Sequence, residues 1–268
     1  MRARAHPASA NSPDTKFSVI KRRLRKRILA KLDKYLGASS LGAIESVNVD
    51  SNLAALTFDD GPHPKWTPLV LKVLEKHGAK ATFFMLGKQA AKHPELIRQV
   101  RQAGHVVGNH SWDHESFPLL RSSQRRQGLA ACQATLGSHA SDLFRPPYGD
   151  QDLASRFDVM RSGYKTILWD LPSQDWEGLD SEEIFNVVQS KLKPGAILLM
   201  HDRLHTTNHI DFADRCAMVE ALEKILAENS DYRFVTVPEL LEAGTPKGSF
   251  RAQVGDPEAF AKLVVMDE

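Results

Sequence analysis

Two adjacent carboxylates, Asp59 and Asp60, follow the apolar run LAALTF and precede a Gly-Pro pair in the stretch TFDDGPHPKW. Neighbouring side chains of a strand point to opposite faces, so these two can share a site only where the strand ends. Two carboxylates in one site repel each other. A divalent cation resolves this when one carboxylate binds it and the other stays ionised as a base. In the simpler alternative, one aspartate caps a helix and the other is solvated.

The stretch HSWDH carries two histidines, His110 and His114, at a spacing that could chelate one metal ion from a helical turn or a compact loop. The chain has 11 histidines, so such pairs also arise by chance. The stretch HDRLHTTNH contains two more pairs among His201, His205 and His209, and we expect the last two on a surface loop. Spacing alone therefore leaves the metal ligands open.

Short apolar runs alternate with amphipathic ones from residue 53 onward. The apolar runs lack a clean two-residue alternation, as is typical of strands that are buried on both faces. The seven predicted strands are Leu53–Phe58, Ala81–Leu86, His105–Val107, Leu143–Arg145, Lys165–Trp169, Ala196–Met200 and Arg233–Val237. Apolar spacing also predicts helices from Trp66 to a stop at Gly78, from Pro94 to Gly104, and after a cap at Ser181.

This alternation predicts an α/β fold whose parallel sheet is either open or closed as a barrel. A core of about 190 residues suits a small β/α barrel. The polar residues of interest also follow the strands: Asp59 and Asp60 the first, His110 and His114 the third, Arg145 the fourth, Asp175 the fifth and His201 the sixth. Because active sites of β/α barrels lie at this carboxyl edge, the pattern favours the barrel.

Five separated motifs occur in order on these successive loops: TFDDGP (57–62), HSWDH (110–114), RPPYGD (145–150), DW (175–176) and LLMHD (198–202). Together they resemble the NodB-type polysaccharide deacetylases, which form carbohydrate esterase family 4. The resemblance covers roughly residues 50–243. It implies a distorted (β/α)7 barrel, here preceded by a basic amphipathic N-terminal helix.

The resemblance assigns a metal site to Asp60, His110 and His114. Such an Asp-His-His site leaves coordination positions open for water and substrate, as a catalytic metal requires. We expect one divalent ion, with zinc as the first candidate; cobalt, nickel or iron would accept the same ligands.

The resemblance also assigns the catalytic groups: Asp59 as general base, His201 as general acid, Arg145 as the holder of the base, and Asp175 as the orienting partner of the acid. Three residues are implied around the substrate: the Tyr148 backbone N–H at the oxyanion, Trp176 as a wall of the sugar site, and Leu198 in the pocket for the acetyl methyl. One departure is Pro172, which stands where many members have an additional aspartate and replaces none of these groups.

We therefore expect a metal-dependent hydrolase that removes N-acetyl groups from an amino sugar in an oligosaccharide, polysaccharide or glycolipid precursor and releases acetate. An alternative within the superfamily is an amidohydrolase that acts on a non-sugar C–N bond. An alternative of another class is an inactive carbohydrate-binding protein on the same fold, which would usually lack Asp59 or a metal ligand.

The net charge of +2 conceals a strongly basic N-terminal region. Residues 1–36 carry eleven Lys or Arg against two Asp. Apolar residues recur at steps of four and predict a basic amphipathic helix over 17–36: Ile20, Leu24, Ile28, Leu32 and Leu36. That helix could pack on the barrel, bind an anionic membrane surface or bind nucleic acid. Nucleic acid is the least favoured partner, because nothing else in the chain resembles a motif that recognises nucleic-acid bases.

We divide the chain into a disordered N-terminus (1–16), the basic helix with a linker (17–49), the deacetylase-like domain (50–243) and a C-terminal extension (244–268) with a short helix near Pro257–Val265. The two cysteines show no metal-binding spacing. No run approaches the roughly 18 apolar residues of a membrane span, and no secretory signal is recognisable. We therefore expect a cytoplasmic protein, with peripheral contact at the inner face of the membrane through residues 17–36.

Overall fold

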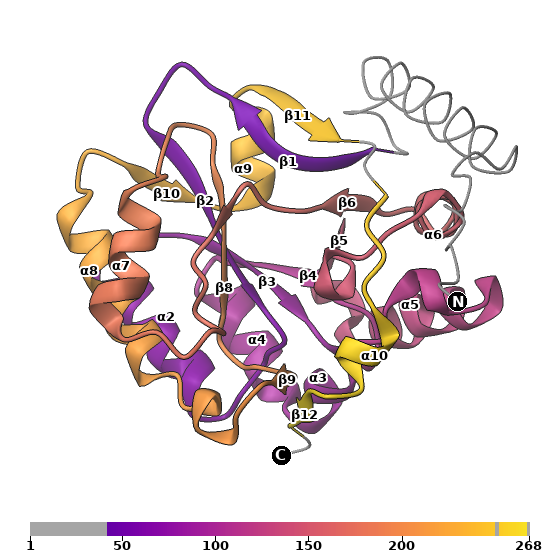
Figure 1. Cartoon of the computed structure of the whole chain (residues 1–268). Coiled ribbons are helices and arrows are strands. Elements are labelled where there is room, and N and C mark those ends of the chain that lie inside the picture. The colour runs from indigo at the N-terminus through magenta and orange to yellow at the C-terminus, as the bar shows by residue number, and fades with distance from the viewer. Residues whose placement is uncertain (1–41, 250–251, 267–268) are drawn as a thin grey trace, which may run out of the picture.

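The computed structural model describes residues 42–249 and 252–266 (Figure 1). The expected disordered N-terminus (1–16) and basic amphipathic helix (17–36) lie outside these residues. Within the described ranges, no helix is long and apolar enough to cross a membrane.

A curled sheet forms the centre of the molecule, and all seven predicted strands are present in it and pair in parallel. They are β2 (Leu53–Asp59), β3 (Ala81–Met85), β4 (Val106–Asn109), β5 (Ala140–Phe144), β6 (Lys165–Ile167), β8 (Ile197–His201) and β10 (Arg233–Val235). Because helices cover the outside of this curled sheet (Figure 1), the predicted distorted (β/α)7 barrel is confirmed.

Two strands extend the sheet beyond the predicted boundaries. β1 (Ala43–Asn48) lies within the expected linker, and β11 (Thr245–Ser249) lies within the C-terminal extension; the two pair antiparallel, and β1 also pairs with β6. With β7 (Leu171–Pro172), the strand order is β11-β1-β6-β5-β4-β3-β2-β8-β7, and β10 pairs with β2. The linker assignment is therefore wrong for residues 43–48. The six-residue strand AIESVN is too short to give a clear hydrophobic periodicity, so the sequence did not reveal it.

Helices connect the parallel strands on the outer side of the sheet: α2 (Trp66–Lys76), α3 (Gly87–Lys92), α4 (Pro94–Gln102), α5 (Ser122–Leu136), α6 (Leu153–Arg161), α7 (Ser181–Gln189) and α8 (Cys216–Glu228). The short helix α9 (Val237–Glu242) instead leads from β10 to β11 and packs Val237 and Leu240 against the interior of the sheet. Single 3-10 turns lie at Phe117–Leu119, Gly137–His139, Pro147–Gly149 and Ile210–Ala213. The predicted helices that begin at Trp66 and Pro94 are confirmed. The predicted cap at Ser181 is wrong by one residue: the Asp180 side chain accepts the Glu183 N–H at 2.8 Å.

β2 and β8 are buried on both faces, so their side chains divide between two apolar clusters. Leu56 and Leu198 point outward and pack beneath the helices. Ala55 and Ile197 point inward and fill the interior of the curled sheet. This inner cluster gives way to polar residues at the carboxyl end of β2, where Asp59 stands, and it forms the floor of the functional site.

The chain returns to the carboxyl edge of the sheet after β11. There it forms α10 (Pro257–Phe260) and then β12 (Val264–Val265), which pairs antiparallel with β9 (Thr206–Thr207). The predicted short helix near Pro257–Val265 is thus confirmed for its first turn only.

Candidate active site

The adjacent aspartates reach one pocket because β2 ends between them. Asp59 is the last strand residue, and Asp60 has a φ angle of 71°, in the left-handed region that aspartate tolerates better than most residues. Gly61 follows because any side chain there would clash with the buried carboxylate of Asp202, to which the Thr67 hydroxyl donates. Both aspartates are only 3 % exposed, so the alternative with one solvated carboxylate is wrong.

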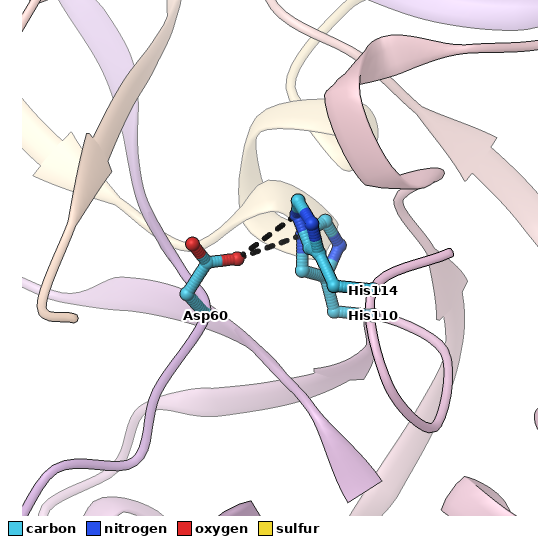
Figure 2. Close-up of side chains that lie close together, drawn as sticks. All are labelled: Asp60, His110 and His114. Carbon is cyan, nitrogen blue, oxygen red and sulfur yellow. Dashed lines mark ion pairs between the residues drawn. The ribbon is translucent and has the colours of Figure 1, made fainter. Parts of the chain in front are cut away.

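Asp60, His110 and His114 converge in this pocket (Figure 2). The Asp60 Oδ1 atom lies 3.3 Å from His110 Nε2 and 3.2 Å from His114 Nε2. Both histidines belong to the loop after β4, which is compact rather than helical. In the described part of the chain, these three are the group of metal-binding side chains whose ligand atoms all lie within 4.8 Å of one another.

The protonation states of these side chains suit a cation. Burial alone would raise the pKa of Asp60, but the imidazoles of His114 and His110 hold it well below its usual range, so the carboxylate is ionised. Burial lowers the pKa of His114 despite the neighbouring Asp60, and this favours the neutral imidazole that coordinates metals.

The hydrogen bonds around the group also leave ligand atoms free. His110 Nδ1 lies 2.8 Å from the carbonyl of Arg145, which can only accept, so Nδ1 carries the donated proton and Nε2 faces Asp60. Among the described residues, the buried Asp60 Oδ1 has no hydrogen-bond partner, whereas its Oδ2 accepts the His205 N–H at 2.7 Å. The three predicted ligands therefore fit a divalent cation.

Asp59 is held beside this group by a buried arginine. Arg145 Nη1 donates to Asp59 Oδ1 at 2.8 Å, and the fully buried guanidinium also donates to Thr57 Oγ1 and to the carbonyl of Leu168. The other carboxylate oxygen, Oδ2, lies 3.8 Å from His110 Nε2. The structure thus brings Asp59 and Arg145 together as predicted, with one carboxylate oxygen directed at the metal ligands.

The partly exposed His201 and the buried Asp175 form a second pair in the same region. His201 Nδ1 lies 3.0 Å from Asp175 Oδ1, and the His201 backbone N–H donates to Oδ2 at 2.9 Å. Burial alone would lower the pKa of His201, but the Asp175 carboxylate raises it above its ordinary value. Trp176 meets the imidazole in a T-shaped contact, with ring centroids 5.3 Å apart. His201 is therefore oriented, and its protonated form is stabilised, as suits a general acid.

Arg215 is a residue of this site that the sequence did not reveal. It is buried, pairs with the Asp175 carboxylate through Nη2, and donates from Nη1 to the Asp175 carbonyl at 2.9 Å. Its Nε also donates to the His201 carbonyl at 3.2 Å. A single arginine before α8, outside any periodic pattern or motif, carries no signal that could have identified it.

Replacing Arg215 by Met should move the alkaline limb of the kcat–pH profile to higher pH. The substitution removes a cation near the His201 imidazolium while Asp175, Asp59 and Asp60 keep their charges, so the pKa of His201 rises. A weaker acid protonates the leaving group more slowly, and we expect kcat to fall by about tenfold, less than for loss of the acid itself. Arg215→Lys should restore most of the wild-type profile, and an alkaline limb that does not move would contradict this role.

The pocket has a volume of about 320 Å³. It is lined by the predicted residues that must face a substrate: Asp59, Asp60, His110, His114, Tyr148, Trp176 and His201. Arg145 and Asp175 lie behind this lining and hold its members in place. The volume is at the lower end of the roughly 300–1,000 Å³ that is usual for small-molecule sites.

Leu198 is not in the pocket, so its predicted place there is wrong. It is fully buried on the outer face of β8, and Leu199 lines the pocket instead. Side chains of a strand alternate between faces, so the residue two positions before His201 shares its face, whereas the residue three positions before it does not. Leu199 is therefore the leucine of β8 that faces the pocket, which Leu204 and Leu263 also line.

The expected surface position of His205 is also wrong. The residue is only 9 % exposed, and its ring lies 4.9 Å, centroid to centroid, from that of His114. Burial, followed by the neighbouring His114, lowers the pKa of His205 to about 4. His209 has an exposed side chain, as expected. The loop after β8 folds back over the metal ligands, which spacing within HDRLHTTNH did not reveal.

Positive φ angles at non-glycine residues gather at this site. Asp60, His114 and Tyr148, with φ angles of 71°, 63° and 58°, all line the pocket. Ser111 and Gln174, at 73° and 60°, adjoin His110 and Asp175 respectively. Backbone strain of this kind persists where surrounding structure enforces it, and it is concentrated at functional sites.

Comparisons with known proteins agree with this arrangement. A sequence profile of the family described as polysaccharide deacetylase matches residues 46–167. A peptidoglycan-N-acetylglucosamine deacetylase of Bacillus cereus is 36% identical over 198 residues, which cover 72% of this chain and 89% of that protein. A chitooligosaccharide deacetylase of Azorhizobium caulinodans is 33% identical over 168 residues, which cover 61% of this chain and 80% of that protein.

Solved structures show the same fold. A peptidoglycan N-acetylglucosamine deacetylase in complex with 4-naphthalen-1-yl-N-oxidanyl-benzamide superposes with a TM-score of 0.68 at 29% identity, over 75% of this chain and 93% of that chain. A family 4 carbohydrate esterase pseudoenzyme from Bacillus anthracis gives 0.67 at 25% identity, over 77% and 70%. The fold is therefore shared by deacetylases and by a pseudoenzyme.

Proposed function

Because the chain belongs to the polysaccharide deacetylase family, we propose that it is a metal-dependent N-deacetylase. Its substrate would be an N-acetylated amino sugar in an oligosaccharide, polysaccharide or glycolipid precursor. One observation carries this proposal: a single pocket brings together Asp59, the ligand group around Asp60, and His201. A base, a cation site and an acid in one pocket are what amide hydrolysis at neutral pH requires.

The chain's own residues divide the proton transfers of this reaction. Asp59, held by Arg145, takes a proton from the attacking water. His201 gives its proton to the leaving nitrogen as the C–N bond breaks, and Asp175 keeps the imidazole oriented and charged. The backbone N–H of Tyr148 would donate to the developing oxyanion. The products are acetate and a free amino sugar.

Asp60, His110 and His114 would hold one divalent ion, which we expect to be zinc. Two imidazoles and one carboxylate also suit cobalt, nickel or iron. When bound, such an ion polarises the acetyl carbonyl and lowers the pKa of water at the site.

Acetate release tests the proposal directly. Purified protein would be assayed, after chelation and after addition of zinc, on N-acetylglucosamine oligomers, an N-acetylated polysaccharide, a lipid-linked N-acetyl sugar and a small cyclic amide. We expect metal-dependent acetate from at least one sugar. Turnover of the cyclic amide alone would favour the amidohydrolase alternative, and bound metal without any turnover would favour an inactive carbohydrate-binding protein.

The basic N-terminal region supports a further part of the proposal, namely contact with an anionic membrane surface at its cytoplasmic face. Eleven Lys or Arg within residues 1–36 would each contribute about 1 kcal/mol near such a surface. Deleting residues 17–36 should abolish co-sedimentation with phosphatidylserine vesicles, and wild-type binding should weaken as salt rises. Equal binding by the deletion variant, or equal binding to zwitterionic vesicles, would contradict this.

A further inference from the structure

The C-terminal segment, residues 252–266, is attached to the loop that follows β5. Gln253 and Gln151 exchange two backbone hydrogen bonds, of 2.6 and 2.9 Å. The Gly255 N–H donates to Asp150 Oδ2 at 2.9 Å. Asp150 and Gln151 lie in the same loop as Arg145 and Tyr148, so one end of the segment is fixed beside the pocket.

The other end of the segment is attached to the loop that follows β8. β12 pairs with β9, and the Met266 N–H donates to the His205 carbonyl at 2.8 Å. Arg203 donates to the Met266 carbonyl. Figure 1 shows α10 and β12 beside β9, at the end of the sheet where the strands β2 and β8 finish.

The segment crosses the pocket between these two attachments. In the sheet, β4, β3 and β2 lie between β5 and β8, and the loops after β4 and β2 carry the metal ligands. Phe260 stacks on the ring of Tyr148 with centroids 4.2 Å apart, and the Tyr148 ring also meets that of His114 in a T-shaped contact at 4.4 Å. Leu263 lines the pocket itself.

We propose that residues 252–266 are a wall of the substrate pocket that selects short N-acetylated oligosaccharides, or the sugar at a chain end, over units inside a long polymer. This inference rests on the proposed deacetylase function and names its substrate class. The inner units of a polymer can react only if the chain extends out of the pocket on both sides. A segment that bridges the β5 and β8 loops blocks one of these directions, and the pocket volume of about 320 Å³ leaves room for a short ligand.

Two variants and a control test this wall. One variant ends at residue 251, which keeps β11 and its pairing with β1 and removes the whole segment. Leu263→Ala is a point variant at the pocket, and Lys262→Ala is its matched control, because Lys262 is exposed on the same segment. For each, kcat/KM would be measured on an N-acetylglucosamine trimer and on a soluble long N-acetylglucosamine polymer.

The wild type should prefer the trimer. The truncated variant should raise the polymer-to-trimer ratio of kcat/KM by about tenfold, the size of effect that one or two lost pocket contacts produce. Leu263→Ala should raise KM for the trimer several-fold and leave kcat nearly unchanged, and Lys262→Ala should match the wild type. A segment that only stabilises the fold would lower kcat/KM for both substrates equally, and that unchanged ratio would overturn the inference.

Calorimetric binding of the same two sugars separates this inference from the proposed function. If the wild type releases no acetate from any sugar, the proposed function fails. The inference about residues 252–266 then holds only if the truncated variant binds the polymer more tightly, relative to the trimer, than the wild type does. If truncation prevents folding, as judged by circular dichroism, Leu263→Ala decides: the wall requires weaker trimer binding than in Lys262→Ala.

Discussion

Replacing Asp59 by Asn is expected to lower kcat for acetate release by about 100- to 10,000-fold, the usual contribution of a general base. The amide keeps the shape of the carboxylate and still accepts the hydrogen bond from Arg145, but it cannot take a proton from water. Metal content, measured by elemental analysis, should stay at the wild-type level because Asp59 is not among the three ligands.

The same substitution leaves Arg145 buried without its counter-charge. Breaking a buried ion pair costs about 3–5 kcal/mol, so Tm should fall, and activity must be compared well below the transition. Asp142→Asn is a matched control, because Asp142 has a 55% exposed side chain and pairs with the exposed Lys165 at the surface. Activity of Asp59→Asn within a few-fold of that control would refute the role of Asp59 as base.

Replacing Asp60 by Asn should instead remove the metal and, with it, the activity. Asp60 is the one carboxylate in the ligand group, and its Oδ1 lies 3.2–3.3 Å from both imidazole nitrogens. Substitutions that merely touch the hydrogen-bonding partners of metal ligands cost about 10–100-fold in affinity, so loss of an anionic ligand should cost more than about 100-fold.

Added zinc distinguishes the two neighbouring aspartates. Excess zinc should restore part of the activity of Asp60→Asn by mass action and none of the activity of Asp59→Asn. Titration of zinc against both variants, with acetate release and bound metal read together, checks this. Normal metal content in Asp60→Asn would show that the ligand lies elsewhere, and zinc rescue of Asp59→Asn would exchange the two roles.

The strands and the positions of the motifs were predictable from the sequence because both depend on local pattern. In a continuous apolar run such as Leu53–Phe58, side chains on both faces of the strand must be buried, so the strand lies between two packed layers. This pattern identifies buried parallel strands. Residues directly after such strands must meet at one edge of the sheet. Asp59, His110 and His201 could therefore be placed at one site before any contact was known.

Contacts between distant segments were decided only by the tertiary structure. β1 and β11 are recognisable as strands because they pair with each other across some 200 residues, and neither has a strong pattern of its own. Arg215 and His205 have no motif; the loop after β8 buries them against Asp175 and Asp60. The role of an isolated polar residue such as Arg215 depends on its contacts in the folded chain, so it could not be predicted from local sequence.

The positions of Leu199 and Leu263 in the pocket lining also depend on the tertiary structure. Leu198 and Leu199 are identical in type and adjacent in sequence. Alternation puts Leu199 on the face of His201, but only the pairing of β8 with β2 and β7 turns that face towards the pocket. Leu263 lies far along the chain from every motif and reaches the pocket because β12 pairs with β9. The sequence by itself determined which residues could do chemistry and at which edge of the sheet they meet. Strand register and long-range pairing decided which apolar side chains surround them, because those depend on the packing of the whole chain and not on local pattern.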